Sequence, residues 1–289
     1  ECALAMIRAE LQERRAEGAA AGAEGAAEGA EAEAAATARF DHSASAAAMR
    51  RMGQVLRYRG DLDGAAQWLN RALSMERRMN STSPGLAETL HELGVLRARQ
   101  GAAESARDLL SEALRIKVGL QRRRDSAGGA DGAEATAERE SARDCFGEAA
   151  TLHQLAIVAT LGKPPRFDEA TRLLQRVLAK TRTSPAARAS SMQQLARIAT
   201  RRGAVEAAHA WLSEALALHE TAYRSKYHVN IAAAHQKLGL AEMAMKPTPR
   251  LDSAEIHLNQ CLAIRRRLYA ADHVEVAAAL HSLGRLERE

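Results

Sequence analysis

Aromatic residues, cysteines and long apolar runs are all scarce in this chain. Only 3% of its 289 residues are Phe, Trp or Tyr although 46% are hydrophobic, so we expect a core of close contacts between aliphatic side chains. The three cysteines, Cys2, Cys145 and Cys261, are far apart and odd in number. This pattern argues against a disulfide framework and a zinc site, and it favours a reducing, cytoplasmic compartment. No apolar run approaches the ~18 residues that span a membrane, and we recognise no signal peptide, so no membrane association is expected.

Motifs of catalysis and cofactor binding are missing as well. The ten histidines include no H-E-x-x-H, and there is neither a P-loop nor a G-x-G-x-x-G that follows a strand. The sequence therefore predicts no enzyme activity, no metal, no cofactor and no small-molecule substrate in this segment. Because the chain begins with Glu1 rather than methionine, we expect it to be part of a longer protein, in which a catalytic domain elsewhere remains an open alternative.

The net charge of +5 and the pI near 9.4 come mainly from arginine. Most of the short basic runs lie near expected helix ends, where cations interact favourably with the helix dipole. No aromatic residue interleaves these runs, as a base-stacking surface would require. We therefore interpret them as solvated helix ends rather than as a nucleic-acid surface. The runs are Arg77–Arg78, Arg122–Arg124, Arg201–Arg202 and Arg265–Arg267.

Residues 85–121 read as two amphipathic helices joined at a glycine. In the first, Leu90, Leu93 and Leu96 recur on one face. Gly101 interrupts the pattern, and the second helix has a stripe that begins at Ala106 and continues through Leu110. Such a hairpin cannot bury both stripes alone, so it predicts copies of itself on either side.

The copies are present at a regular spacing. A small residue follows the central Leu or Met of each first helix, because only Gly or Ala lets two helix axes approach closely. These small residues are 41, 62, 40, 43 and 45 residues apart, and the one long interval contains a 20-residue insertion. They are Gly53, Gly94, Ala156, Ala196, Gly239 and Gly284.

The spacing divides the chain into complete repeats, two truncated ends and two insertions. Residues 1–15 are expected to form the second helix of a truncated repeat, and residues 273–289 the first helix of another. The insertions, residues 16–44 and 122–141, consist largely of Ala, Gly and charged residues and are expected to be mobile or at best a frayed helix. The complete repeats are residues 45–84, 85–121, 142–184, 185–225 and 226–272.

The Leu and Gly/Ala positions that recur in these repeats form two columns, one in each helix of the hairpin. They resemble the tetratricopeptide repeat, with L-x-x-[GA] in the first helix and A-x-x-x-L-x-x-A-L in the second. A period near 42, longer than the usual 34 residues, resembles the kinesin light chain type of these repeats. Residues 261–284, CLAIRRRLYAADHVEVAAALHSLG, carry the closest match. The resemblance implies an all-α fold, a right-handed α-solenoid of stacked antiparallel hairpins. HEAT and armadillo repeats have similar periods, but the Gly/Ala columns favour the tetratricopeptide interpretation.

Stacked hairpins of this type present a concave surface lined by their first helices. The residue after each leading Leu or Met projects away from the core stripe. We expect a row of these residues, together with residues one and two turns further along the same helices, to line a groove of hydrogen-bond donors with apolar patches. The paired asparagines of the kinesin light chain repeats are replaced in this row. The candidate groove residues are Arg50, Gln54, Arg57, His91, His153, Gln193, Arg197, Gln236, His281 and Arg285.

The resulting hypothesis is a non-catalytic scaffold that binds a protein or peptide, with acidic peptides as candidates and a kinesin light chain-like cargo adaptor as one form of it. An unspecialised solvated face is the plain alternative. Two other functions stay open. One is a sensor or autoinhibitory region of a larger NTPase-linked signalling protein, and the other is an RNA-binding helical repeat, which is the less expected of the two.

Overall fold

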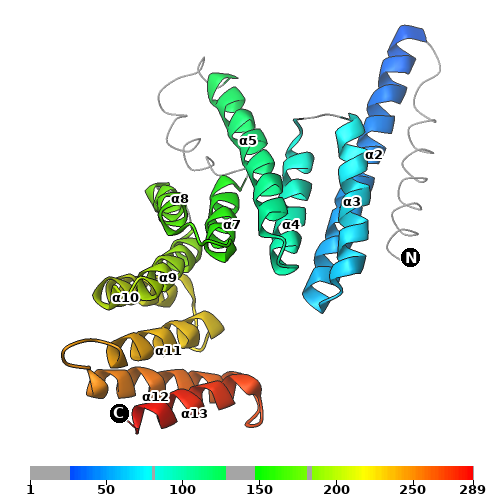
Figure 1. The fold of residues 1–289 in the computed structure, drawn as a ribbon. Helices are drawn as coiled ribbons and strands as arrows, with labels where there is room; N and C mark the ends of the chain where they lie inside the picture. The colour runs from blue at the N-terminus through cyan, green and yellow to red at the C-terminus, as the bar shows by residue number, and fades with distance from the viewer. Residues whose placement is uncertain (1–26, 80–81, 128–146, 181–183, 289) are drawn as a thin grey trace. The chain divides into compact units, whose positions relative to one another are not determined.

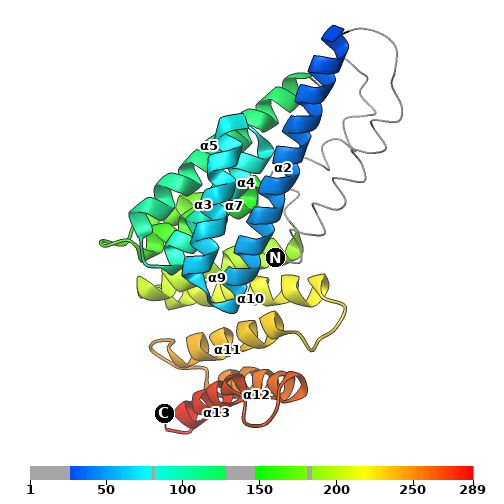
Figure 2. The same cartoon turned by 90° about the vertical axis from the view of Figure 1, so that its right-hand side faces the viewer.

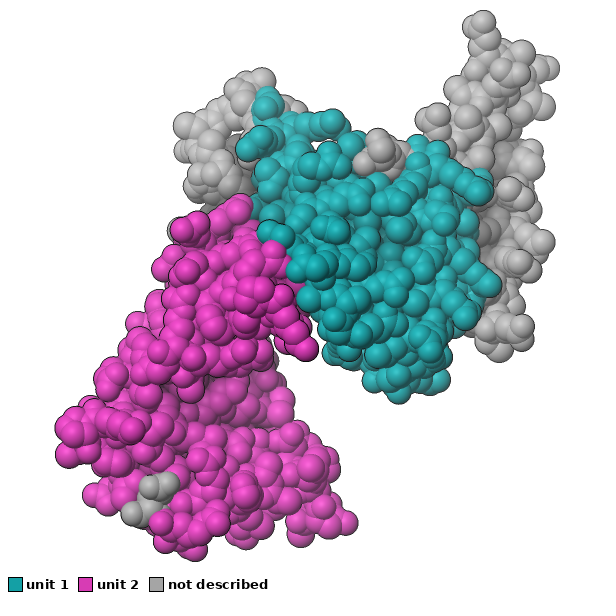
Figure 3. Space-filling model, viewed as in Figure 1, with its two compact units in different colours: residues 1–138, 145–151 teal, residues 139–144, 152–289 magenta. Residues whose placement is uncertain are grey.

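The computed structural model describes residues 27–79, 82–127, 147–180 and 184–288 (Figure 1). The chain divides into two compact units, unit 1 with residues 1–138 and 145–151, and unit 2 with residues 139–144 and 152–289 (Figure 3). All the regular secondary structure in the described ranges is helical, which agrees with the all-α expectation.

Among its described residues, unit 1 contains four helices and the first turn of a fifth. They are α2 (Ala27–Arg59), α3 (Leu62–Met79), α4 (Pro84–Arg99), α5 (Ala103–Ala127) and the start of α7 (Glu148–Leu161). Helix α2 packs along α3 and α4 packs along α5, so each pair forms a hairpin, and α3 joins the hairpins by packing on α4.

Unit 2 contains the rest of α7 and six further helices. They are α8 (Phe167–Ala179), α9 (Pro185–Arg201), α10 (Val205–Ala222), α11 (Val229–Met243), α12 (Leu251–Leu268) and α13 (Val274–Leu286). Helices α9 and α10 form one hairpin and α11 and α12 the next, with α10 against α11 and α12 against α13. Figures 1 and 2 show these layers from α9 to α13 following one another along the stack.

The glycines of the small-residue column lie where a first helix touches the second helix of its own hairpin. A Cβ added at Gly53 or at Gly94 would lie 2.6 Å from the Cγ of Leu69 or of Leu110, respectively. At Gly239 it would lie 2.9 Å from the Cγ of Leu258. Such distances are too short for two carbon atoms, so the close packing expected from the sequence is confirmed at these sites.

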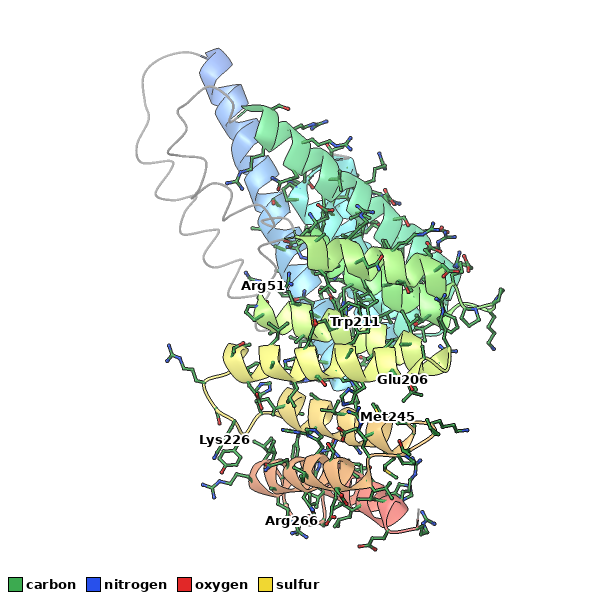
Figure 4. All side chains as sticks on the ribbon, turned by 90° about the vertical axis from the view of Figure 1, so that its left-hand side faces the viewer. Arg51, Glu206, Trp211, Lys226, Met245 and Arg266 are labelled. Atoms are coloured by element: carbon green, nitrogen blue, oxygen red, sulfur yellow. The ribbon has the colours of Figure 1, made fainter. Side chains whose placement is uncertain are left out.

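The predicted stripes of the second helices are buried. In unit 1, Ala65, Leu69 and Ala72 are fully buried, as are the corresponding Ala254, Leu258 and Cys261 of unit 2. Trp211 of α10 (Figure 4) packs against three clusters of buried residues within unit 2, which is the packing role expected of it.

Two residues that take the positions of Leu96 and Leu90 in their own repeats, and that the repeat pattern therefore assigns to the core, are exposed instead. Val55 is 48% exposed, whereas Leu96, its equivalent in the next repeat, is fully buried beside α3. Leu280 is 45% exposed, whereas its equivalent Leu90 is buried beside α5. In both corrections the cause is the same: no described helix covers that face of α2 or of α13.

Helices α4 and α9 begin at serine caps. Ser83 and Ser184 each stand before a proline, and their hydroxyls accept hydrogen bonds from the backbone N–H groups of Leu86 and Ala187. These caps satisfy donors that the first helical turn leaves free. Helices α11 and α13 begin at histidine caps, described below. Within three of the hairpins the turn contains a glycine with positive φ, a backbone conformation that favours glycine. These are Gly60, Gly101 and Gly203.

The expected insertions are partly helical. Helix α2 starts at Ala27 rather than near residue 46, and α5 continues to Ala127, so residues 27–44 and 122–127 extend neighbouring helices. Alanine and glutamate favour the helix strongly enough to outweigh the scattered glycines of this segment. The remaining parts of both insertions, and residues 1–15, lie outside the described residues. No helix of the described ranges has the length and apolar character needed to cross a bilayer.

Candidate ligand-binding surface

In unit 1, Arg50 joins the first hairpin to the second instead of projecting into solvent. Its Nη1 donates to Glu76 Oε1 at 3.1 Å and to Thr89 Oγ1 at 3.4 Å, and its Nη2 lies 2.9 Å from Glu88 Oε2. Glu76 is buried, and burial raises the pKa of its carboxyl group, while the hydrogen bond with Thr89 and the charge of Arg50 act in the opposite direction. Arg50 thus belongs to a polar contact between α3 and α4.

The next turn of α2 has the same arrangement. Gln54 Nε2 donates to Glu92 Oε1 at 2.8 Å, and Arg57 Nη2 donates to Glu92 Oε2 at 3.1 Å. The side chains of Arg57 and Glu92 are 8% and 13% exposed, so this ion pair is shielded from solvent. One carboxylate of α4 therefore occupies two of the expected groove residues of α2.

The histidines of the row also contact the following repeat. His91 Nδ1 lies 3.1 Å from Thr151 Oγ1, which accepts a hydrogen bond from Lys117 Nζ at 3.0 Å. Burial, with the nearby cations Lys117 and Arg57, lowers the pKa of His91 from 6.5 to about 3. The imidazole is therefore neutral at physiological pH.

In unit 2, the contacts of the row are made without carboxylates until α13. His153 Nδ1 lies 3.0 Å from Ser191 Oγ, and burial lowers the pKa of His153. Gln193 Nε2 lies 3.0 Å from Nε2 of the buried His219, whose pKa is lowered by burial and then by His228 and Lys237.

Gln236 makes the last of these contacts. Its Nε2 donates to Ser282 Oγ at 2.8 Å, and its Oε1 accepts from Arg265 Nη2 at 2.9 Å. Arg265 in turn forms an ion pair with Glu275 of α13 at 2.6 Å. Two of the three remaining expected groove residues, His281 and Arg285, are exposed on α13.

The row expected to be free is thus largely engaged within each unit. The residues that bond a neighbouring helix are Arg50, Gln54, Arg57, His91, His153, Gln193 and Gln236. This corrects the expectation that the whole row presents free donors, because neighbouring helices of the same or of the next hairpin supply polar partners. Any binding role of these residues stays a prediction.

Arg197 is exposed as well, and it lies in a pocket of about 250 Å³ between α9 and α11. Three cationic side chains, Arg197, Arg201 and Lys237, line this pocket together with an apolar floor that includes Leu212 and Leu240. No Asp or Glu is among the lining residues. The full lining is Gln193, Ala196, Arg197, Thr200, Arg201, Val205, Leu212, Lys237, Leu240, Ala241 and Ala244.

The cations of this pocket are held in place. Lys237 Nζ donates to Gln193 Oε1 at 2.8 Å, and Arg201 Nη1 donates to the carbonyl oxygen of Thr160 at 3.2 Å while its guanidinium lies over Phe167. Burial, and then the charge of Arg197, lowers the pKa of Lys237. Within the described residues Arg197 forms no ion pair, so the pocket carries positive charge without an internal carboxylate.

The sequence did not indicate Lys237 or Arg201 as site residues. Lys237 directly follows the expected Gln236, but the helix periodicity placed only the latter in the row. Arg201 was interpreted as a solvated helix end. Arg201 lies one helical turn after Arg197 on α9, so local spacing places the two side by side. Lys237 lies beside Arg197 only because α9 and α11 pack in adjacent hairpins, and no local spacing contains that information.

A second polar cluster lies elsewhere on α11. The buried Glu242 accepts a hydrogen bond from Ser253 Oγ at 2.7 Å and lies 3.2 Å from His209 Nε2 and 3.9 Å from His257 Nε2. His257 also lies beside His235, whose pKa is lowered from 6.5 to about 4, chiefly by burial and then by His257. Within the described residues, no group of three or more His, Cys, Asp or Glu side chains is arranged to hold a metal ion.

Two stretches of the chain match families described as tetratricopeptide repeat, residues 44–117 in unit 1 and residues 188–223 in unit 2. Both contain the Leu and Gly/Ala columns described above. These two stretches of the chain are tetratricopeptide repeats. No curated protein sequence matches it.

Solved tetratricopeptide structures share its fold. BtubC (BKLC) from P. vanneervenii has 16% sequence identity and a TM-score of 0.62, with 93% of this chain and 92% of that chain covered. A Podosopora anserina protein of kinesin light chain type, with nearly identical TPR-like repeats, has 21% identity and a TM-score of 0.56, covering 78% of this chain and 97% of the other.

A third likeness is to the apo form of the quorum sensor NprR from B. thuringiensis. It has 13% identity and a TM-score of 0.60, with 84% of this chain but only 58% of that chain covered. At such low identities these likenesses establish the fold alone, an all-α tetratricopeptide solenoid, as the sequence predicted.

Proposed function

We propose that this tetratricopeptide protein is a non-catalytic scaffold that binds an acidic segment of a partner protein, and that the pocket between α9 and α11 takes the acidic side chain. The observation that carries the proposal is the set of three cations around an apolar floor with no carboxylate among them. Charge-assisted hydrogen bonds from such groups to a carboxylate are stronger than neutral ones.

The size of the pocket supports a peptide rather than a free small molecule. Its volume of about 250 Å³ is below the range usual for pockets that enclose drug-sized ligands. Leu212 and Leu240 offer an apolar contact next to the cations, so the best-fitting segment has an acidic residue beside an aliphatic one. A cytoplasmic adaptor of the kinesin light chain kind is the form of the proposal that the repeat type suggests.

The test uses an immobilised array of acidic peptides, each paired with a copy in which Gln and Asn replace Glu and Asp. The protein is expected to bind a subset of the acidic members and none of their neutral copies. For that subset, Arg197→Ala is expected to weaken binding about tenfold, which corresponds to about 1.4 kcal/mol. Lys237→Glu should remove measurable binding, because it places a carboxylate inside the pocket.

Arg202→Ala is the matched control. Arg202 is the neighbour of Arg201 at the end of α9, yet its Nη2 pairs with the exposed Asp168 at 2.7 Å and it does not line the pocket. Its removal should change the affinity by less than about twofold, as for a solvent-exposed ion pair outside the site. The proposal is wrong if no acidic peptide binds, or if Lys237→Glu binds the same peptides as strongly as the unchanged protein.

A further inference from the structure

In unit 2, the linker between α10 and α11 and the C-terminal end of α12 form a basic edge around an exposed tyrosine. The segment between α10 and α11 carries Arg224, Lys226 and Tyr227, and the end of α12 carries Arg266 and Arg267. The guanidinium of Arg267 lies 5.9 Å from the centre of the Tyr227 ring, and Lys226 Nζ lies 5.6 Å from it. Figure 4 shows Lys226 in the linker and Arg266 on α12. We call these five residues the linker edge.

The charge of the linker edge is not neutralised within unit 2. All four cations are exposed, and in the described part of the chain none of them forms an ion pair. Residues 223–229 and 266–274 contain one acidic side chain, Asp272, against the four bases. Tyr227 is 41% exposed, so part of its ring is open to a ligand.

Two histidine caps fix the backbone of both linkers. The ring of His228 stacks on Tyr223 with centroids 3.5 Å apart, and its Nδ1 accepts a hydrogen bond from the backbone N–H of Asn230. His273 stacks on Tyr269 at 4.2 Å and caps α13 in the same way. A ligand at the linker edge would therefore meet a surface with little backbone freedom to lose.

We propose that the linker edge binds single-stranded nucleic acid, with the phosphates on Arg224, Lys226, Arg266 and Arg267 and one base stacked on Tyr227. Proteins that bind single strands combine a cationic surface with aromatic rings on which bases stack. In the sequence no aromatic residue interleaves the basic runs, and that argued against such a surface. The fold supplies the missing ring, because it brings Tyr227, which precedes α11, beside Arg267 at the end of α12.

Tyr227 is what separates this ligand from other anions. An anionic membrane or an acidic peptide would also be attracted to the four cations, but neither requires a π-surface beside them. Stacking on a tyrosine ring is expected to be lost with alanine and kept with phenylalanine, so a pair of substitutions at residue 227 reports it directly. The linker edge shares no residue with the pocket between α9 and α11, so the two proposals can fail independently.

The experiment measures fluorescence anisotropy of a labelled oligouridylate of about 12 nucleotides, within the usual site sizes. Tyr227→Ala should weaken binding about tenfold and Tyr227→Phe less than about twofold, since the phenyl ring keeps the stacking. With four phosphate contacts, the slope of log K against log salt should be roughly −3. Arg266→Ala with Arg267→Ala should reduce that slope by about 1.4.

Matched controls come from unit 1. Tyr58 is 76% exposed with the Arg57 guanidinium 4.7 Å from its ring, and Arg122 and Arg123 are an exposed basic pair. Tyr58→Ala and the double substitution Arg122→Ala with Arg123→Ala should leave the affinity unchanged. Lys237→Glu should also bind the oligouridylate normally.

Three results would overturn the proposal. The first is no binding at low salt, and the second is equal loss with Tyr58→Ala and Tyr227→Ala. The third is stronger binding to phosphatidylserine–phosphatidylcholine vesicles or to a polyglutamate peptide than to the oligouridylate, with no effect of Tyr227→Ala. That outcome would identify the linker edge as a general anionic contact.

Discussion

The same junction is built differently in the two units. Where α2 meets α4 in unit 1, Gln54 and Arg57 both bond to Glu92, a residue of α4. Where α9 meets α11 in unit 2, the residue equivalent to Gln54 is Arg197 and the residue equivalent to Glu92 is Lys237. The carboxylate that neutralises the first junction is thus replaced by a cation in the second.

This difference separates structural from binding positions within one repeat architecture. A polar group that finds its partner in the next hairpin contributes to the stack, and removing that partner leaves a desolvated group. A polar group without such a partner is available to a ligand. The peptide-binding hypothesis therefore applies to the α9–α11 junction and not to the α2–α4 junction, although both have the same backbone arrangement.

The largest expected effect follows from removing the carboxylate of unit 1. Glu92→Lys leaves Arg57, whose side chain is 8% exposed, beside a second cation. Breaking a buried ion pair in this way costs about 3–5 kcal/mol, because the remaining charge stays desolvated. Urea unfolding followed by circular dichroism measures the loss, and Glu92→Gln should show a smaller one.

The reciprocal substitution sharpens the comparison. Lys237→Glu creates a carboxylate opposite Arg197 and should leave the stability of unit 2 unchanged or raise it by up to about 1 kcal/mol. If Glu92→Lys and Lys237→Glu destabilised the protein equally, the two junctions would be equivalent and the distinction between them would be wrong.

The packing beneath the polar junctions should, in contrast, respond alike in both units. Gly94→Val and Gly239→Val each place side-chain atoms against Leu110 or Leu258, and overpacking of this kind costs about 1–3 kcal/mol. The free energies of unfolding from urea titrations of both variants should fall by similar amounts.

Gly284→Val is the control for this pair. A Cβ at Gly284 would meet no side chain and no other helix within 4 Å, apart from its two neighbours in the chain, so valine should change the free energy of unfolding by less than about 0.5 kcal/mol, as at an ordinary surface position. An equal cost at Gly284 and Gly94 would mean that the glycines are not required by the contact with the second helix.

The sequence predicts those features of the fold that depend on contacts within a single hairpin. Ala106 and Leu110 could be assigned to the core, and Gly94 to the helix crossing, because helical spacing alone places them on one face. Val55 and Leu280 obey the same spacing but are exposed, since their burial depends on a neighbouring helix.

The candidate site was harder to predict because each polar side chain's availability depends on the next hairpin. Arg57 and Arg197 look alike as members of the expected groove, yet one meets Glu92 and the other meets no carboxylate. Tyr227 and Arg267 likewise form one surface, although one precedes α11 and the other lies at the end of α12. Such pairings depend on how the helices pack and not on any local pattern.

A further prediction concerns how the free energy of unfolding depends on pH, through one histidine in each unit. The folded-state pKa is about 3 for His91 in unit 1 and about 4 for His235 in unit 2, both below the ordinary 6.5. As the pH falls through 6.5, the unfolded chain takes up a proton at each residue and the folded chain does not. The stabilisation is therefore complete above pH 6.5 and is lost on acidification, by about 1 kcal/mol per histidine down to about pH 5.5.

Urea titrations at a series of pH values test this prediction with His91→Gln and His235→Gln, each of which should remove its own share of the loss. The comparison between the units becomes sharper at lower pH. His235 should stop contributing below about pH 4, when the folded chain also takes up its proton, and His91 should continue to about pH 3. The exposed His281, replaced in the same way, is the control. If His281→Gln reduced the acid sensitivity as much as His91→Gln does, burial would not be the cause of the neutral imidazole.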